Sequence, residues 1–298
     1  MLVESIPNVS EGRDAATLAA LVAAVRGVPG ARLLDHSADA AHHRSVFTIA
    51  GAPGPVTQAV LALAAVAIAR IDLRHHDGVH PRVGAIDVIP FVPLTGATMD
   101  DCVTLAREVG ATLASRHDLP VYLYEAAATH EERRRLEVIR RGNVEGLAAR
   151  MRDPAWMPDY GPPRPHPTAG ATVVGARAPL IAFNVWLEST DVTLAREIAA
   201  RIRTSSGGLP CLKALGLTVA GGRAQVSMNL TDYTVTGLPA VYAAVAREAA
   251  ALGVALGPSE LIGLVPEAAI AGTDPSRVGL RTFSPRQILE RRLADADD

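Results

Sequence analysis

The sequence contains little cysteine, and this limits the class of protein it can encode. Only Cys102 and Cys211 occur among 298 residues. A secreted scaffold held together by disulfides needs a denser set, so we expect no disulfide framework. The shortage favours a reducing, cytoplasmic setting.

A surplus of charge of one sign is also lacking. The 29 basic and 31 acidic residues give a net charge of −2, so we expect neither nucleic acid nor an anionic membrane as a partner. The chain opens without a basic segment and apolar stretch, so no signal peptide is expected. The most apolar run, Pro55 to Arg70, is interrupted by Thr57 and Gln58. It is too short to span a bilayer and predicts a buried core helix.

Three common active-site motifs are absent. The sequence has no G-x-G-x-x-G, no phosphate loop ending in Gly-Lys-Ser/Thr and no G-x-S-x-G. Dinucleotide, nucleoside triphosphate and α/β-hydrolase chemistry are therefore unsupported. Lysine is nearly absent too, since Lys213 stands alone in an arginine-rich chain. It is either a compact charge that arginine cannot replace or a chance surface residue.

What the chain does contain predicts an α/β (α+β) protein of two layered subdomains, residues 1–178 and 179–298. In the first, apolar patterns predict strands and helices in alternation. The expected strands are 2–7, 31–35, 45–50, 85–94 and 121–124. The expected helices begin after Asp14, near Pro55 and after a Thr98–Asp101 capping box, with a charged helix around residues 131–141.

The second subdomain is expected to follow the order βαββαβ, which is typical of a ferredoxin-like sheet. Its strands are expected at 180–187, 212–219, 224–229 and 261–265, with helices at 191–203 and 239–253. Gly221 and Gly222 predict a hairpin turn, and Ser284 with Gln287 predicts a capped terminal helix. The first subdomain begins in the same order, so a related sheet is expected there. Residues 152–168, rich in proline, predict a long ordered loop or a domain connector.

Histidines gather in two segments of the first subdomain, residues 35–44 and 74–82, beside aspartate and arginine. Histidine exchanges protons near neutral pH, and arginine binds carboxylates. For His36, His75 and His76 we favour solvated loop positions. A zinc site using Asp39 or Asp77 is the alternative, but the spacing matches no zinc signature. Acid–base chemistry is therefore the favoured interpretation, and no metal is expected.

Seven runs, in order between residues 2 and 266, carry a resemblance to a known family. They are residues 6–12 (IPNVSEG), 76–88 (HDGVHPRVGAIDV), 120–124 (PVYLY), 170–177 (GATVVGAR), 180–184 (LIAFN), 225–230 (QVSMNL) and 263–266 (GLVP). Together they resemble glutamate formimidoyltransferase. The resemblance implies two α/β subdomains with a folate-binding groove between them, and a homodimer. Because the chain stops at Asp298, the cyclodeaminase domain of bifunctional relatives is not expected.

The resemblance also implies a reaction. The formimidoyl group of N-formimidoyl-L-glutamate passes to the 5-position nitrogen of tetrahydrofolate, a co-substrate, during histidine degradation and one-carbon metabolism. The catalytic histidine of the family falls on His80. Ser37 departs from an aspartate in bifunctional relatives, and Asp39 is our candidate for the supporting carboxylate. Formyl transfer from 5-formyltetrahydrofolate to glutamate, a non-catalytic folate-binding protein and a zinc-dependent hydrolase remain alternatives.

Further residues are candidates for binding. The folate-contacting loop of the family falls on Gly161, Pro162, Pro163, Arg164, Pro165, His166, Pro167, Thr168, Ala169 and Gly170. Substrate-binding candidates are Asn8, Arg44, Arg82, Asn184, Lys213 and Asn229. Arginines suit substrate carboxylates and Lys213 suits the folate tail, while the asparagines could bind pterin or amidine. An ion pair is the alternative for Arg82, and capping or turn roles are the alternative for the asparagines.

Overall fold

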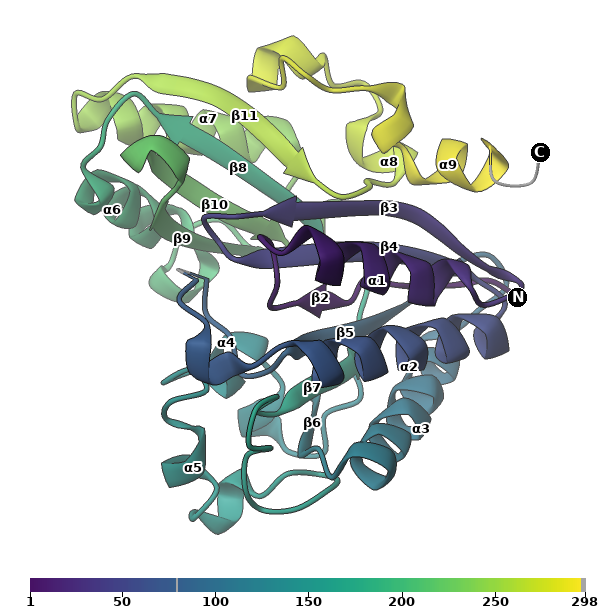
Figure 1. The fold of residues 1–298 in the computed structure, drawn as a ribbon. Helices are drawn as coiled ribbons and strands as arrows, with labels where there is room; N and C mark the ends of the chain where they lie inside the picture. Colours follow the sequence, from purple (N-terminus) through teal and green to yellow (C-terminus); the bar gives the residue numbers. More distant parts are fainter. Residues whose placement is uncertain (79, 296–298) are drawn as a thin grey trace. The chain divides into compact units, whose positions relative to one another are not determined.

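The computed structural model describes residues 1–78 and 80–295. The chain divides into two compact units, Met1–Arg177 and Ala178–Asp298 (Figure 1). Each unit contains a sheet and a hydrophobic core of its own.

The first unit contains a seven-stranded sheet and five of the labelled helices among its described residues. Its strands are β1 (Val3–Ser5), β2 (Asn8–Val9), β3 (Ala31–Asp39), β4 (Arg44–Gly51), β5 (Ile86–Pro93), β6 (Val121–Glu125) and β7 (Thr172–Ala176). Its helices are α1 (Ala15–Arg26), α2 (Pro53–Arg70), α3 (Met99–His117), α4 (Leu136–Ile139) and α5 (Leu147–Arg150).

The sheet of the first unit is built on a ferredoxin-like βαββαβ unit. β1 and β2 both lie between β4 and β5 and pair with them in antiparallel fashion, so they act as one interrupted strand. β3 pairs with β4, which gives the order β3, β4, β1/β2, β5. Beyond β5, the parallel strands β7 and β6 extend the sheet. The predicted fold class is confirmed, with this extension as an addition.

The cap residues that we expected do begin the helices. Asp14 accepts hydrogen bonds from the backbone N–H groups of Ala16 and Thr17 at the start of α1, and Thr98 forms the full capping box with Asp101 at α3. α1, α2 and α3 enclose the main core with the sheet. A second cluster, which includes Val88, Tyr122 and Met151, forms a separate core in this unit.

Helix α2 is the apolar run of the sequence. Among the described residues it is the one helix that is long and apolar enough to cross a membrane by length and composition alone. Its inner face, Val56, Ala59, Val60, Leu63, Ala64 and Ala67, is fully buried in the main core of the first unit. It is therefore placed as a core helix, as predicted, and it begins slightly earlier, at Pro53.

Two expectations for the first unit are wrong. Residues 131–141 do not form one charged helix, because Arg133 turns inward and binds Asp159 and the Met157 carbonyl, which leaves a 3₁₀ turn and the short α4. Of the two alternatives for the proline-rich residues 152–168, the domain connector is wrong, since they precede β7 within the first unit, and the ordered loop is correct. We missed β7 because its five residues, all buried, contain only two large apolar side chains, Val173 and Val174, so they do not give the long apolar run that marked β5.

The second unit confirms the predicted βαββαβ order. Its strands are β8 (Ile181–Leu187), β9 (Leu212–Thr218), β10 (Ala224–Leu230) and β11 (Leu256–Ile262). Its helices are α6 (Val192–Ile202), α7 (Leu238–Ala251), α8 (Glu267–Ile270) and α9 (Leu289–Asp295). The antiparallel order β11, β8, β10, β9 is ferredoxin-like.

Details at the turns and ends of the second unit follow from local chemistry. Gly221 and Gly222 both adopt positive φ between β9 and β10, as the predicted hairpin turn requires. The Ser284–Gln287 capping box is present, but it begins a 3₁₀ turn before α9. The last strand lies earlier than the predicted residues 261–265, because Gly263 at φ 76° follows the end of β11.

Candidate active site

His80 lies in the segment that leads from α2 to β5, and it is half-buried. Its Nδ1 lies 2.8 Å from the carbonyl oxygen of Pro81 and 3.1 Å from Nη1 of Arg44. A carbonyl oxygen can only accept, so the contact with Pro81 favours the ring form with a proton on Nδ1. In that form Nε2 is an unprotonated base.

The surroundings of His80 oppose the charged imidazolium. Burial lowers the pKa of His80 well below its ordinary value, and the positive charges of Arg44 and Arg140 act in the same direction. The Pro81 carbonyl opposes them less strongly. His80 is therefore neutral near pH 7, and its free ring nitrogen can accept a proton.

Arg44, the first residue of β4, is held from two sides. The Oδ1 atom of Asn8 accepts hydrogen bonds from its Nε at 2.9 Å and its Nη2 at 2.6 Å. The same Nη1 that faces His80 donates to Oδ2 of Asp87 at 3.0 Å. Burial lowers the pKa of Arg44 to about 10, so it stays charged at neutral pH. Arg44 and Asn8, both predicted site residues, thus meet beside the predicted catalytic residue.

Asp87, on β5, is fully buried beneath this group. Its Oδ2 accepts from Arg44 and also from Nη2 of Arg140, and its Oδ1 accepts from the backbone N–H of Val83 at 2.8 Å. Burial would raise the pKa of Asp87, but the charges of Arg140 and Arg44 hold it below its ordinary value. It is therefore a carboxylate that orders two guanidinium groups.

Neither Asp87 nor Arg140 was predicted as a site residue. Asp87 did carry a signal, because it is the one charged residue in the apolar run 85–94. A charged residue in a buried strand needs partners of opposite charge, and this rule points to a cluster. Arg140 gave no such signal, since it lies among several arginines in a charged segment.

Asp39 does not contact His80 directly. It ends β3, with a side chain that is 52% exposed, and it accepts from the backbone N–H of His42 at 2.8 Å and faces Nδ1 of the same residue at 3.3 Å. The His42 ring lies edge-on to the His80 ring, with centroids 6.0 Å apart. The predicted supporting carboxylate is thus linked to His80 through His42.

The other histidines divide between surface and interior. His36 and His75 are both exposed, as we favoured, but His36 does not lie in a loop: it belongs to β3, and its ring stacks on Phe47 with centroids 6.2 Å apart. His76 is not solvated in that sense, because its ring stacks on that of His43 with centroids 4.1 Å apart and its Nε2 donates to the His43 carbonyl oxygen at 2.9 Å. Burial lowers the pKa of His76. Among residues 1–78 and 80–295, no group of three or more His, Cys, Asp or Glu side chains is placed to hold a metal ion.

Arg82 and the end of the proline-rich loop form hydrogen bonds with the segment around His76 and His80. The Nη2 atom of Arg82 binds the His76 carbonyl at 2.8 Å and Glu145 at 3.1 Å, which agrees with the ion pair that we left open. The end of the loop is tied to the same segment, since Leu73 donates to the Thr168 carbonyl and Ala85 to the Ala169 carbonyl. This places residues 168–170 along the backbone that carries His80.

The remaining candidates belong to the second unit. Asn184 on β8 is buried and donates to Glu260 at 3.1 Å. Lys213 on β9 lies directly opposite the exposed Asn229 on β10. Their predicted roles toward substrate and folate stay predictions.

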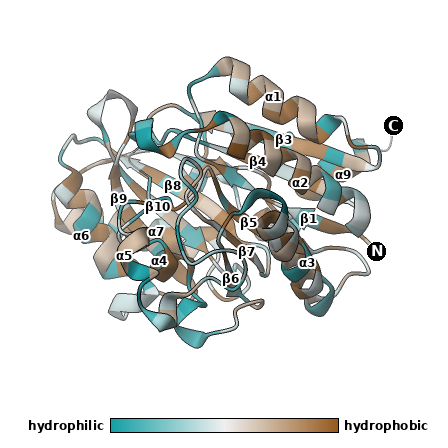
Figure 2. Cartoon of the chain, turned by 60° about the horizontal axis from the view of Figure 1, so that its bottom comes forward, coloured by the Kyte–Doolittle hydropathy of each residue, from teal (hydrophilic) through white to brown (hydrophobic). Residues whose placement is uncertain are grey.

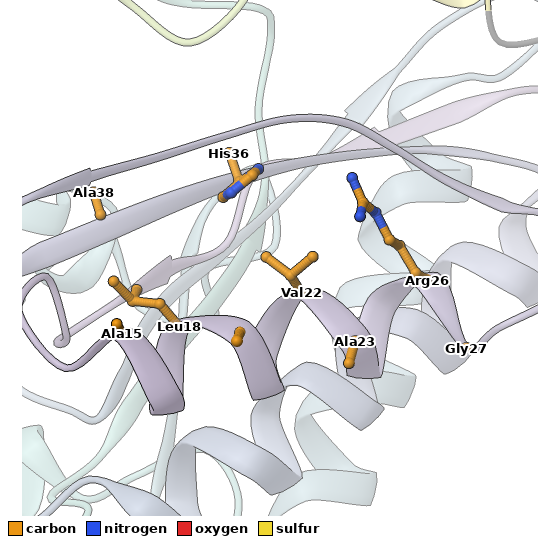
Figure 3. Close-up of a pocket in the computed structure, with 9 residues that line it drawn as sticks. Ala15, Leu18, Val22, Ala23, Arg26, Gly27, His36 and Ala38 are labelled. Carbon is orange, nitrogen blue, oxygen red and sulfur yellow. The ribbon is translucent and has the colours of Figure 1, made fainter.

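A separate hollow of about 870 Å³ lies on the first unit between α1 and β3 (Figure 3). Leu18, Val22 and Arg26 of α1 line it together with His36 and Ala38. None of the groups that contact His80 line this hollow, so it is not the candidate active site. Helix α1, which lines the hollow, consists mostly of alanine, leucine and valine (Figure 2).

Comparison with known proteins identifies the family of the chain. A model of the N-terminal subdomain of the formiminotransferase domain matches residues 2–177, and a formiminotransferase domain model matches residues 182–274. The chain belongs to the formiminotransferase family. Members of this family are transferases, and the predicted resemblance is confirmed.

Relatives match over nearly the whole chain. Glutamate formimidoyltransferase from Streptococcus pyogenes serotype M1 is 40% identical over 294 residues, which is 98% of both chains. Glutamate formimidoyltransferase from Thermoplasma acidophilum is 39% identical and covers 99% of this chain and 98% of its own. Formimidoyltransferase-cyclodeaminase from Gallus gallus is 42% identical over 90% of this chain but only 51% of its own length. The chain thus spans about half of such a bifunctional relative.

Proposed function

We propose that this protein transfers the formimidoyl group of N-formimidoyl-L-glutamate to the 5-position nitrogen of tetrahydrofolate, which gives 5-formimidoyltetrahydrofolate and L-glutamate. The family supports the reaction. The observation from the site that carries it is His80, a half-buried imidazole kept neutral beside two arginines. Amine exchange at an amidine carbon needs such a group.

The chemistry requires two proton transfers. The folate nitrogen attacks the amidine carbon, a new C–N bond forms, and the attacking nitrogen must lose its proton. Nε2 of His80 accepts that proton. The same proton then passes to the glutamate nitrogen, the old C–N bond breaks, and glutamate leaves. One histidine thus serves as base and then as acid. Because its pKa is lowered, the protonated imidazole is a better proton donor in the second step.

Asp39 is our proposed partner for the protonated amidine. Its carboxylate is half-exposed, so an incoming cation can reach it, and His42 fixes its orientation. A carboxylate at that position favours the charged, electrophilic amidine. The fully buried Asp87 is occupied by Arg44 and Arg140, so it supports the arginines instead.

We also propose that the loop end at residues 168–170 contacts folate. Its backbone runs beside the segment that carries His80. His166 stabilises this end of the loop, because its Nδ1 accepts from the Ala169 N–H at 3.0 Å and its backbone pairs with Gly170. An ordered loop loses little conformational entropy on binding. Lys213 remains our proposed contact for the glutamate tail of folate.

An assay of the purified protein tests the function. N-formimidoyl-L-glutamate and tetrahydrofolate should yield 5-formimidoyltetrahydrofolate, and exhaustive chelation should leave the rate unchanged. Absence of transfer would contradict the proposal. Loss of transfer on chelation, with recovery on adding zinc, would favour the zinc alternative. A parallel reaction with 5-formyltetrahydrofolate and glutamate measures the formyl alternative.

The setting and assembly of the protein are proposed with the function. We propose a cytoplasmic enzyme, because both cysteines are free thiols and the chemistry uses no oxidised pair. We propose a homodimer from the family resemblance. Sedimentation of the purified protein at micromolar concentration would show a dimer, and a monomer would refute it.

A further inference from the structure

Arg140 is a charged group of this site with a buried hydrogen-bond donor that is not used by any described residue; Arg82 has one too, but its Nη2 is bound to the His76 carbonyl and to Glu145. Arg140 follows α4, and its side chain is only 11% exposed. Its Nη2 donates to Asp87. Its Nε is buried, and among the described residues no hydrogen-bond acceptor reaches it. A buried donor without an acceptor is costly, and an acceptor on a ligand removes that cost.

The charges around Asp87 also leave a surplus. Arg44 and Arg140 both donate to the same oxygen, Oδ2 of Asp87, so two buried positive charges share one negative charge. The guanidinium of Arg44 is further engaged by two hydrogen bonds to Asn8. Among the described contacts, the guanidinium of Arg140 forms fewer hydrogen bonds than that of Arg44. A buried surplus of positive charge is complemented by an anion, and the planar guanidinium suits a carboxylate.

We propose that Arg140 binds the α-carboxylate of the amino-acid donor and so places the leaving nitrogen at His80. This proposal rests on the proposed function. In an N-formimidoyl amino acid, the nitrogen that leaves and the α-carboxylate are bonded to the same carbon. The group that binds this carboxylate must therefore lie close to the acid–base residue.

Arg140 meets this requirement through a short chain of contacts. It shares Oδ2 of Asp87 with Nη1 of Arg44, and that Nη1 lies 3.1 Å from Nδ1 of His80. Other substrate carboxylates fit less well. The γ-carboxylate is two carbons further from the leaving nitrogen. The carboxylates of folate are separated from its reacting nitrogen by the whole aminobenzoyl group.

Two truncated donors test the proposal with the wild-type protein. N-formimidoyl-γ-aminobutyrate lacks the α-carboxylate, and N-formimidoyl-2-aminobutyrate lacks the γ-carboxylate. We expect kcat/KM to fall by roughly 10- to 100-fold more for the donor without the α-carboxylate, since a contact with a charged group is lost. Equal values, or the opposite order, would overturn the proposal. No transfer from N-formimidoyl-L-glutamate itself would instead refute the proposed function.

Substitution of Arg140 gives a second test. Arg140→Gln should lower kcat/KM by roughly 10- to 100-fold for donors with an α-carboxylate and by less than about threefold for N-formimidoyl-γ-aminobutyrate. An equal loss for every donor would assign Arg140 a structural role. Arg141→Gln changes the exposed neighbouring arginine and is the matched control, with wild-type selectivity expected.

A change of the formimidoyl acceptor shows whether the carboxylate that Arg140 binds belongs to the amino-acid donor or to folate. Tetrahydropteroate lacks the glutamate tail of tetrahydrofolate. The loss caused by Arg140→Gln should be the same with either acceptor. If the loss disappears with tetrahydropteroate, Arg140 binds the folate tail and the proposal is wrong. If Arg140→Gln does not fold, equal kcat/KM values for the two truncated donors in the wild-type protein would still overturn the proposal.

Discussion

Nη1 of Arg44 lies 3.1 Å from Nδ1 of His80, so a buried cation stands directly beside the imidazole that we assign to proton transfer. The same nitrogen donates to Asp87. Arg44 can therefore stay in place without an acceptor on His80, and the histidine is free to keep its own proton on Nδ1. Together with burial, the charge of Arg44 keeps the imidazole of His80 neutral by lowering its pKa.

Removing the charge of Arg44 should change the pH profile. The positive charge lowers the pKa of His80, so Arg44→Gln should raise it. Because the base must be unprotonated, the acid limb of kcat/KM should move to higher pH, while burial still holds the pKa of His80 below its ordinary value. Arg44→Lys keeps the charge and should keep the limb at its wild-type position. If the acid limb of the pH profile moves equally in Arg44→Gln and Arg44→Lys, the charge of Arg44 is not what lowers the pKa of His80.

Asp87 should be critical for stability. Asp87→Asn leaves two buried guanidinium groups without their carboxylate, and breaking such a pair costs about 3–5 kcal/mol. Urea unfolding monitored by circular dichroism measures the loss. Asp77→Asn is the matched control: its side chain is 74% exposed and pairs with Arg13, so a much smaller loss of stability is expected because solvent screens this pair. Similar costs for the two variants would contradict the role of burial.

Gly12 should tolerate no side chain. A Cβ there would lie 2.3 Å from the Asp39 carbonyl oxygen and 2.7 Å from the Arg44 nitrogen, and both atoms are backbone. Gly12→Ala should therefore cost about 1–3 kcal/mol in unfolding free energy and lower activity, because it displaces two site residues. Gly54→Ala, where nothing lies within 4 Å, is the control and should be neutral or slightly stabilising. A Gly12→Ala protein with wild-type stability and activity would show that the backbone there can shift freely.

The sequence predicted those elements that are determined by hydrogen bonds or patterns between residues close together in the chain. Asp14 and the Thr98–Asp101 box satisfy backbone groups within one helical turn, so their patterns suffice to place α1 and α3. The βαββαβ order of the second unit followed from regular alternation. β7 was missed because it shows neither polar alternation nor an apolar run as long as that of β5, which is also buried.

The site could be predicted only in part, because some of its contacts join residues that are far apart in the sequence. His80, Arg44 and Asn8 come from segments whose patterns marked them, and the structure brings them together. Asp87 and Arg140 meet across 53 positions of sequence through a tertiary contact. No local rule pairs one arginine among many with a particular carboxylate. Asp39 was proposed because it lies two residues after Ser37, where the resemblance implies an aspartate, and among the described contacts it is linked to His80 through His42.

The most direct test of the central claim is the rate of formimidoyl transfer from N-formimidoyl-L-glutamate to tetrahydrofolate by His80→Ala, measured beside the wild-type protein. We expect the variant to fold normally and to lose turnover by roughly two to four orders of magnitude, the usual effect of removing an acid–base group. His75→Ala, at a side chain that is 81% exposed, is the control and should keep wild-type turnover. A folded His80→Ala protein with near-wild-type turnover would contradict the account.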